Sequence, residues 1–540
     1  MNTTKLLGTG ALSPSFVFDH DSGNAIFGLS SSTLVVLVAM IAVSTLTLKS
    51  VLPGDRSINL PGPRGWPIVG SWFDLGNNWA EYFRQAAKEY GDVFKVHIGN
   101  RTVVVVNSPK AAHILFNEHG SSLISRPWFY TFHGVLSKSS AFTIGTSAWS
   151  DSTKNKRKAA ATALNRPAVQ SYMPIIVEES LDAVRRILND GNAGKNGIVP
   201  YSYFQRLALN TSFQVNYGFR MGERDDGLFD EISEVIAKVA SVRAVTGSLQ
   251  DYVPLMRYLP ANAKSKAAAS YGLRRKKFMS KLYEELEQRV NQGKDESCIT
   301  GNILKDTESR KKLSRLEIDS ICLSMVSAGL DTFANTMIWT IGFLAKHPEI
   351  QRKAQAELLA HYPNRELPHV DSEDLVYIHA MAKEASRLFN VFRICLPRTN
   401  VSDVTYNNAV IPAGTTFFLN SWACNVDAEK FADPFEFKPE RFMDKSASNA
   451  HVENKMGGVE TYAFGMGRRM CPGVFLALRE IYTTLVFLTH FFDIAPDGEY
   501  DIDPLTAVED GRAFSVRPKP FKVRCTPRPG VDLSPVLDKQ

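Results

Sequence analysis

The chain has 540 residues, of which 44% are hydrophobic and 22% charged, values that are typical of a folded globular protein. This composition excludes a chain that is disordered throughout and a protein with many membrane spans. The formal net charge of +6 is too diffuse over this length to indicate nucleic-acid binding, so no nucleic-acid partner is expected.

The amino end carries a membrane signal. Residues 22–48 contain no Asp, Glu, Lys or Arg, and about 20 apolar residues suffice to cross a bilayer. We therefore expect a transmembrane anchor at residues 25–48, after a lumenal tail at residues 1–24. A cleaved signal peptide is the competing interpretation, but the apolar run is longer than a signal requires. Because Lys49 and Arg56 follow the run, we expect a single-pass protein of the endoplasmic reticulum membrane with the rest of the chain in the cytoplasm.

A proline-rich segment follows the anchor. Three prolines and two glycines lie between Leu60 and Pro67, and proline fixes φ and is excluded from helix interiors. The segment predicts a stiff hinge at residues 49–66. No internal repeat or composition break divides the remainder of the chain, so we expect one domain at residues 67–529 and a tail at residues 530–540.

Strand signals are sparse in this domain. Apolar and polar residues alternate at the start of Val93–Val106, and Gly99 and Asn100 provide a turn, which predicts a hairpin. Most other segments have helical spacing, as in the apolar residues of Val474–Leu488. The sequence therefore predicts a mainly helical fold with a small β subdomain.

The segment Ser320–Ala345 is apolar enough to be considered a second membrane span. Asp331 lies in its middle, and an aspartate at the centre of a bilayer costs roughly 2.5–3.5 kcal/mol. A long helix buried in the protein core is therefore preferred. Its interior carboxylate becomes a candidate functional group.

Cys471 lies in the stretch FGMGRRMCPG, residues 464–473, directly before a helix. The start of a helix favours an anion and lowers the pKa of a thiol, so we expect Cys471 to be a thiolate. The glycines let the backbone pass close to a large flat group, and Arg469 offers a cation. The other cysteines, which form no CxxC pair, are expected to be inert buried residues: Cys298, Cys322, Cys395, Cys424 and Cys525.

This stretch resembles the ligand loop of the cytochrome P450 haem-thiolate monooxygenases, which reads Phe-x-x-Gly-x-Arg-x-Cys-x-Gly. Its fixed places are filled by Phe464, Gly467, Arg469, Cys471 and Gly473. The resemblance implies the cytochrome P450 fold and a haem b held by these residues, with Cys471 as the axial ligand of the iron. It also implies O2 as co-substrate and NADPH–cytochrome P450 reductase as the partner that delivers electrons.

Further motifs match the same family. Glu384 and Arg387 are three residues apart and share a helix face. They match the family's Glu-x-x-Arg pattern, in which Arg441 would complete a structural triad. Arg398 stands where the family often places an arginine on a haem propionate.

Residues 328–332 resemble the family's oxygen-activation segment. The resemblance implies that Thr332 hydrogen-bonds dioxygen or water and that Asp331 relays protons. The competing interpretation is that the Thr332 hydroxyl bonds back to its own helix and that Asp331 is paired elsewhere. Gly329 would allow a ligand to approach closely or the helix to bend.

The region after Trp149 departs from the family. The family usually has an arginine four residues later, where this chain has Thr153. The sequence leaves open whether Trp149 or a nearby base contacts a propionate, or whether the bases form, with Arg468, a positive face for an acidic reductase. These bases are Lys154, Lys156, Arg157 and Lys158.

Other motifs, such as residues 216–220 and 299–306, resemble the fungal phenylacetate and 3-hydroxyphenylacetate hydroxylase subfamily. This implies hydroxylation of a small aromatic substrate, whose carboxylate needs a cation in an apolar pocket. Arg126 and Arg243 are the candidate anchors, with a surface or haem-side position as the competing interpretation. Two alternatives remain: a tailoring monooxygenase that acts on a different aromatic or polyketide substrate, and a haem-binding membrane protein without oxygenase activity.

Overall fold

The computed structural model describes residues 58–138, 142–222, 226–258, 263–306, 312–443 and 461–537, together with Val35–Val38, Met40, Ile41 and Ser44. The predicted tail at 1–24 and most of the predicted anchor at 25–48 lie outside the described residues. The chain divides after Lys49 into two units. The second unit, called the body below, carries the hydrophobic core.

The described part of the body is mainly helical. Its longer helices are α2 (Trp79–Tyr90), α4 (Asp151–Ala163), α6 (Met173–Asp190), α7 (Tyr201–Tyr217), α8 (Asp226–Arg243), α9 (Ala263–Asn291), α12 (Arg315–Lys346), α13 (Pro348–His361), α14 (Val376–Leu388) and α17 (Val474–Phe491). Short helices are α3 (Pro109–Ala112), η1 (His113–Glu118), η2 (Tyr130–Leu136), α5 (Arg166–Ser171), η4 (Leu249–Asp251), η5 (Pro254–Tyr258), α10 (Ile299–Lys305), α15 (Ser421–Asn425), η6 (Pro439–Phe442), η7 (Gly467–Arg469) and α18 (Ser534–Leu537). The strands are β1 (Val93–Ile98), β2 (Arg101–Val106), β3 (Arg398–Thr399), β4 (Val404–Tyr406), β5 (Ala409–Ile411), β6 (Thr416–Leu419), β7 (Phe492–Pro496) and β8 (Val523–Pro527).

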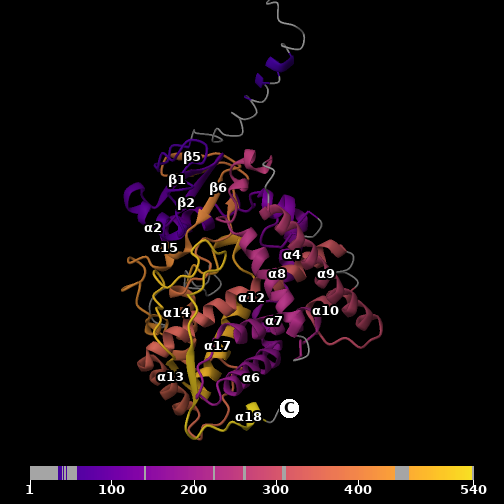
Figure 1. Ribbon diagram of the computed structural model, residues 1–540, viewed down its shortest axis with the longest axis vertical. Helices are drawn as coiled ribbons and strands as arrows, with labels where there is room; N and C mark the ends of the chain where they lie inside the picture. The colour runs from indigo at the N-terminus through magenta and orange to yellow at the C-terminus, as the bar shows by residue number, and fades with distance from the viewer. Residues whose placement is uncertain are drawn as a thin grey trace, which may run out of the picture. The chain divides into compact units, whose positions relative to one another are not determined.

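The predicted hairpin is confirmed as the antiparallel pair β1 and β2. It turns at Gly99, whose φ of 56° and close approach to the Tyr252 carbonyl oxygen exclude a side chain. β2 continues in parallel with β6, giving a four-stranded sheet of order β1-β2-β6-β3, and two further sheets have two strands each. Figure 1 shows β1, β2 and β6 gathered at one end of the body, with α12 running among the helices.

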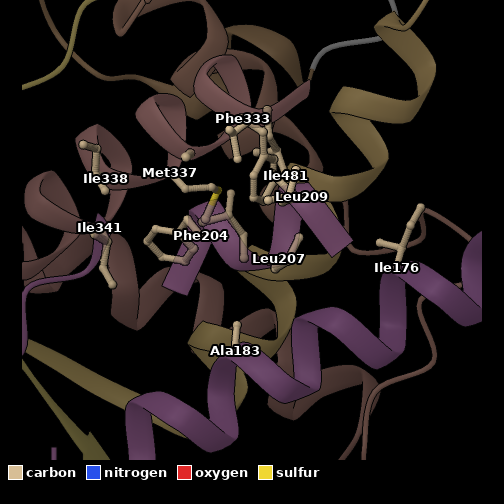
Figure 2. Close-up of a cluster of buried hydrophobic side chains, with 14 of the residues drawn as sticks. Ile176, Ala183, Phe204, Leu207, Leu209, Phe333, Met337, Ile338, Ile341 and Ile481 are labelled. Atoms are coloured by element: carbon tan, nitrogen blue, oxygen red, sulfur yellow. The ribbon is translucent and has the colours of Figure 1, made fainter. Parts of the chain in front are cut away.

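The predicted core helix is confirmed as α12. A capping box at Ser314 starts the helix, and Asp331 and most of the apolar residues of α12 are buried. Figure 2 shows Met337 of α12 in one apolar cluster with Phe204 of α7 and side chains of α6 and α17. In the described part of the chain, α12 and α17 are long and apolar enough to cross a membrane, yet both are mostly buried in the body.

Gly329 has a packing role that differs from the expected one. A Cβ added there would lie 2.9 Å from Oγ of Ser212 on α7. Its small size therefore lets α12 and α7 approach each other.

The packed body extends beyond residues 67–529 at both ends. Ile58 is buried, and Lys95 of β1 donates its backbone N–H to the carbonyl oxygen of Pro61 at 2.9 Å. The described half of the predicted hinge is therefore attached to the sheet. At the other end α18 packs against α6, and Val536 is buried, so part of the predicted tail also belongs to the body.

Candidate active site

Cys471 lies between η7 and α17 in a loop that backbone contacts hold in place. Its N–H donates to the carbonyl oxygen of Phe464 at 3.0 Å, which closes the loop. Gly467 has φ of 64°, and a Cβ added there would lie 1.9 Å from the carbonyl oxygen of Phe116 in η1. Only glycine fits at this crossing point, so the loop is anchored against η1.

The expectation that Cys471 is a thiolate is not met in the chain alone. Burial raises the pKa of the Cys471 thiol above its ordinary value, although the N–H of Gly473 and the charge of Arg157 oppose this. The sequence-based expectation considered the helix start but not the desolvation, which disfavours an anion. A metal cation on the sulfur would reverse the balance, because metal coordination deprotonates a thiol. Gly473 leaves room there, since an added Cβ would lie 3.9 Å from the sulfur.

Four arginines from distant segments gather around this loop: Arg126, Arg157, Arg398 and Arg469. In the described part of the chain, none of them forms an ion pair with a carboxylate. They donate instead to backbone carbonyl oxygens, which include those of Met470 (from Arg157, 2.9 Å), Met466 (from Arg398), Pro397 (from Arg126, 2.7 Å) and Ile124 (from Arg469, 2.8 Å).

The electrostatics of this arginine cluster fit a bound dianion. Burial, reinforced by neighbouring guanidiniums, lowers the pKa of Arg398 and that of Arg469 to about 9. The Nε atoms of Arg126 and Arg469 are buried without a hydrogen-bond partner. Buried charges and donors of this kind require an opposite charge. The haem implied by the sequence carries two propionates, so the cluster and the adjacent Cys471 thiol fit it.

Arg157 is the α4 base that reaches the cysteine loop. Lys156 is buried and donates instead to Oγ of Ser320 on α12 at 3.2 Å. The Trp149 ring contributes to the arginine cluster, with its centre 5.9 Å from the guanidinium carbon of Arg469. Arg157 lies one helical turn after Thr153, so helical spacing could have singled it out. The exposed bases that remain for a partner are Lys154, Lys158 and Arg468.

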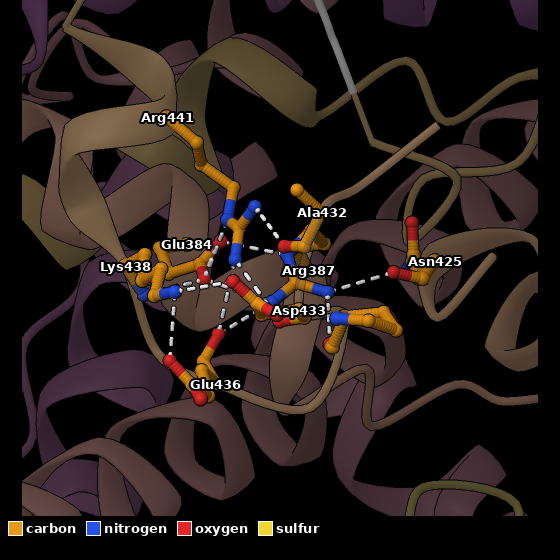
Figure 3. Close-up of polar contacts among 9 residues, drawn as sticks. Glu384, Arg387, Asn425, Ala432, Asp433, Glu436, Lys438 and Arg441 are labelled. Atoms are coloured by element: carbon orange, nitrogen blue, oxygen red, sulfur yellow. Dashed lines mark hydrogen bonds and ion pairs between the residues drawn. The ribbon is translucent and has the colours of Figure 1, made fainter. Parts of the chain in front are cut away.

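The structure brings Glu384, Arg387 and Arg441 together in a buried network (Figure 3). Arg387 donates twice to the Glu384 carboxylate, at 2.7 and 2.8 Å, and Arg441 donates once, at 3.1 Å. Arg387 also donates to the carbonyl oxygen of Asn425 at 2.8 Å, and the side-chain oxygen of Asn425 accepts the N–H of Tyr462 at 2.8 Å. Since Tyr462 directly precedes the cysteine loop, the network is connected to the loop through two hydrogen bonds.

Asp331 and Thr332 occupy successive positions on α12. The Thr332 hydroxyl donates to the carbonyl oxygen of Ala328 at 2.6 Å, as the competing interpretation expected. Its oxygen is left to accept a further hydrogen bond. Asp331 forms no ion pair within the described residues, and its Oδ1 is buried without a partner. Burial raises the pKa of Asp331 to about 6, while Arg243 and Arg517 act in the opposite direction.

Arg243, at the end of α8, lines two pockets, a larger and a smaller one, that share Leu396 and Pro397. Its guanidinium carbon lies 3.9 Å from the centre of the Phe514 ring. Its Nε has no hydrogen-bond partner among the described residues. Arg126 lines only the smaller pocket, which it shares with Arg243, and it donates to the carbonyl oxygens of Leu396 and Pro397.

The Phe514 wall of the larger pocket was not anticipated from the sequence. The Phe514 and Phe392 rings lie 4.5 Å apart, centre to centre. Asn335 of α12 holds this wall, because its side-chain amide donates to Oγ of Ser515 at 2.9 Å. The segment lies nearly 200 residues from α12 and contains no motif that would have identified it.

Comparison with known proteins gives the family. A family model described as Cytochrome P450 matches residues 60–525. Phenylacetate 2-hydroxylase of Emericella nidulans is 43% identical over 87% of this chain and 90% of its own length. The 3-hydroxyphenylacetate 6-hydroxylase of the same organism is 39% identical over 88% and 90%. Isoflavone 3'-hydroxylase of Medicago truncatula is 27% identical over 93% and 97%. The chain therefore belongs to the cytochrome P450 family.

Proposed function

We propose that this cytochrome P450 hydroxylates the aromatic ring of an arylacetate, phenylacetate or 3-hydroxyphenylacetate. The observation that carries the proposal is the 43% and 39% identity, over nearly the whole chain, to two enzymes named for these substrates. As a family member, the chain is a monooxygenase that uses haem, O2 and electrons delivered from NADPH by a reductase. The alternative of a haem-binding protein without oxygenase activity is therefore set aside.

Cys471 would supply a thiolate ligand to the haem iron, and the arginine cluster of Arg126, Arg157, Arg398 and Arg469 would hold the haem propionates. The buried, unpartnered Nε atoms of Arg126 and Arg469 support this assignment. In this proposal the role of Arg126 is to bind the cofactor and not the substrate. When bound, thiolate-ligated haem supplies the activation of dioxygen.

Arg243 would anchor the substrate's carboxylate in the larger pocket. Its unpartnered Nε is a donor for a charge-assisted hydrogen bond. The rings of Phe392 and Phe514 give the pocket apolar walls for the substrate ring. Thr332 would accept a hydrogen bond from an ordered water, and Asp331, with its raised pKa, would hold or release a proton beside it.

The decisive experiment is turnover by the purified full-length holoenzyme with NADPH–cytochrome P450 reductase and NADPH. We expect phenylacetate and 3-hydroxyphenylacetate to gain one ring hydroxyl whose oxygen comes from labelled O2, and a Cys471→Ser preparation to form no product. A panel of neutral aromatic compounds serves as the comparison. Hydroxylation of a neutral compound without turnover of either arylacetate would reject the proposal in favour of a tailoring monooxygenase.

We also propose that residues 25–48 anchor the protein as a single span in the endoplasmic reticulum membrane, with the body in the cytoplasm. The uncharged length of the segment supports this. The full-length protein is expected to resist alkaline extraction from microsomes, and the body is expected to be digested by protease added to sealed microsomes. A mature protein whose first residue lies beyond Leu48 would show instead that the segment is a cleaved signal.

A further inference from the structure

Asp331 and Arg243 interact electrostatically without touching. They form no contact ion pair in the described structure, yet each charge acts on the pKa of the other. Both Asp331 Oδ1 and Arg243 Nε are buried and have no hydrogen-bond partner. Each group therefore retains bonding capacity that a third group can use.

The second cation near Asp331 is already engaged. Arg517 forms an ion pair with Glu509, in which Nη2 donates to Oε1 at 3.2 Å. Its guanidinium carbon also lies 4.8 Å from the ring centre of Tyr201, the titratable group of α7 whose pKa is raised by burial and by the charge of Asp331. Glu509 neutralises Arg517. Of these two cations near Asp331, Arg243 is therefore the one that can pair with a different anion.

The surroundings of Arg243 favour an additional anion. Arg275 of α9 acts on Arg243 as a like charge, and together with burial it lowers the pKa of Arg243 to about 10. In the described structure, Asp331 is the carboxylate that opposes this effect. Because Arg243 also lines both pockets, an anionic substrate there would reach it directly.

We propose that Arg243 is shared, serving Asp331 before substrate binds and the substrate's carboxylate afterwards. Binding then withdraws the counter-charge from Asp331, which takes up one proton from solvent and becomes a proton donor beside Thr332. The inference rests on the proposed arylacetate substrate. It adds that the charge of the bound substrate controls when Asp331 can donate a proton. Without a bound carboxylate, Asp331 stays ionised near neutral pH and withholds its proton.

The sign of the pH dependence follows from these charges. Arg243 favours the ionised form of Asp331, whose pKa is nevertheless raised to about 6 by burial. When a substrate carboxylate neutralises Arg243, the pKa of Asp331 rises further. Between about pH 6 and the higher pKa of the complex, binding takes up a proton, so affinity falls by up to about tenfold per pH unit as pH rises. The substrate, an ordinary carboxylic acid of pKa ~4, stays ionised throughout.

Calorimetry of the full-length holoenzyme at neutral pH can count these protons, if phenylacetate binding is measured in buffers of different ionisation enthalpy. We expect uptake approaching one proton for phenylacetate and none for phenylacetamide, which has the same ring and no charge. The Asp331→Asn variant should bind phenylacetate without proton uptake. In the wild-type protein, an infrared difference spectrum should show a protonated carboxyl group when phenylacetate is added, which makes the test independent of the variant.

Two outcomes separate this inference from the proposed function. If phenylacetate binds without proton uptake, or with equal uptake by the wild type and Asp331→Asn, the shared role of Arg243 is wrong and the substrate assignment stands. If neutral aromatic compounds bind and phenylacetate does not, both are overturned.

Discussion

The Arg387→Leu variant is expected to lose about 3–5 kcal/mol of unfolding free energy, because it leaves the Glu384 carboxylate buried without its main partner. Both side chains are fully buried, and Arg387 makes two hydrogen bonds to Glu384. The variant also deprives the carbonyl oxygens of Asn425, Pro434 and Glu436 of a donor. Denaturant titration of the purified protein measures the loss, and the haem content per chain measures its effect on the cofactor site.

Loss of haem is expected because the network is connected to the cysteine loop. Asn425 joins Arg387 to Tyr462, and the Tyr462 carbonyl oxygen accepts the N–H of Gly465 inside the loop. Removing Arg387 frees Asn425, and through it the segment that positions Cys471. The cofactor is therefore expected to dissociate from Arg387→Leu at lower denaturant concentration than from the wild type.

Lys438→Leu is the matched control. Lys438 pairs with Asp433 and Glu436 at the exposed rim of the same network, where solvent screening leaves an ion pair little effect on stability. Equal losses of stability and haem in Lys438→Leu and Arg387→Leu would contradict the central position assigned to Arg387. If Arg387→Leu does not accumulate, Arg441→Leu tests the same point, because Arg441 makes only one of the four hydrogen bonds to the Glu384 carboxylate and is partly exposed.

The local parts of the fold could be predicted because their signals are local. Alternation over Val93–Val106 identified the hairpin, and the apolar length of α12 with a charge in its middle identified a core helix rather than a second span. The end of the hinge could not be predicted. The proline-rich segment packs on β1 through the Pro61 carbonyl oxygen, a contact that depends on the position of the sheet.

The arginine cluster shows where sequence reasoning reaches its limit. Residue type and motif position distinguished Arg398 and Arg469, but they left Arg126 between the substrate and the haem side and left Arg157 undecided. These side chains come from segments more than 300 residues apart, so their common environment exists only in the folded chain. The thiol of Cys471 is a second example. Its burial, which depends on the folded chain, raises the pKa that the helix start alone would lower.

Arg243→Gln is expected to weaken the binding of phenylacetate by about 10- to 100-fold, the loss of about 1.5–3 kcal/mol that accompanies removal of a charged hydrogen-bond partner. Phenylacetamide should be affected little, because it brings no charge to the pocket. Dissociation constants from substrate-induced changes in the haem absorption spectrum measure both ligands in the same preparation. Arg243→Lys keeps the charge but loses the planar contact with Phe514, so an intermediate effect is expected.

Arg126→Gln separates carboxylate recognition from cofactor binding. Arg126 lines the smaller pocket beside Arg243, but it is engaged with the carbonyl oxygens of Leu396 and Pro397 and belongs to the arginine cluster. We expect this variant to retain less haem and to keep the wild-type ratio of phenylacetate to phenylacetamide affinities in the fraction that remains loaded. If Arg126→Gln changes that ratio and Arg243→Gln does not, the anchor is Arg126.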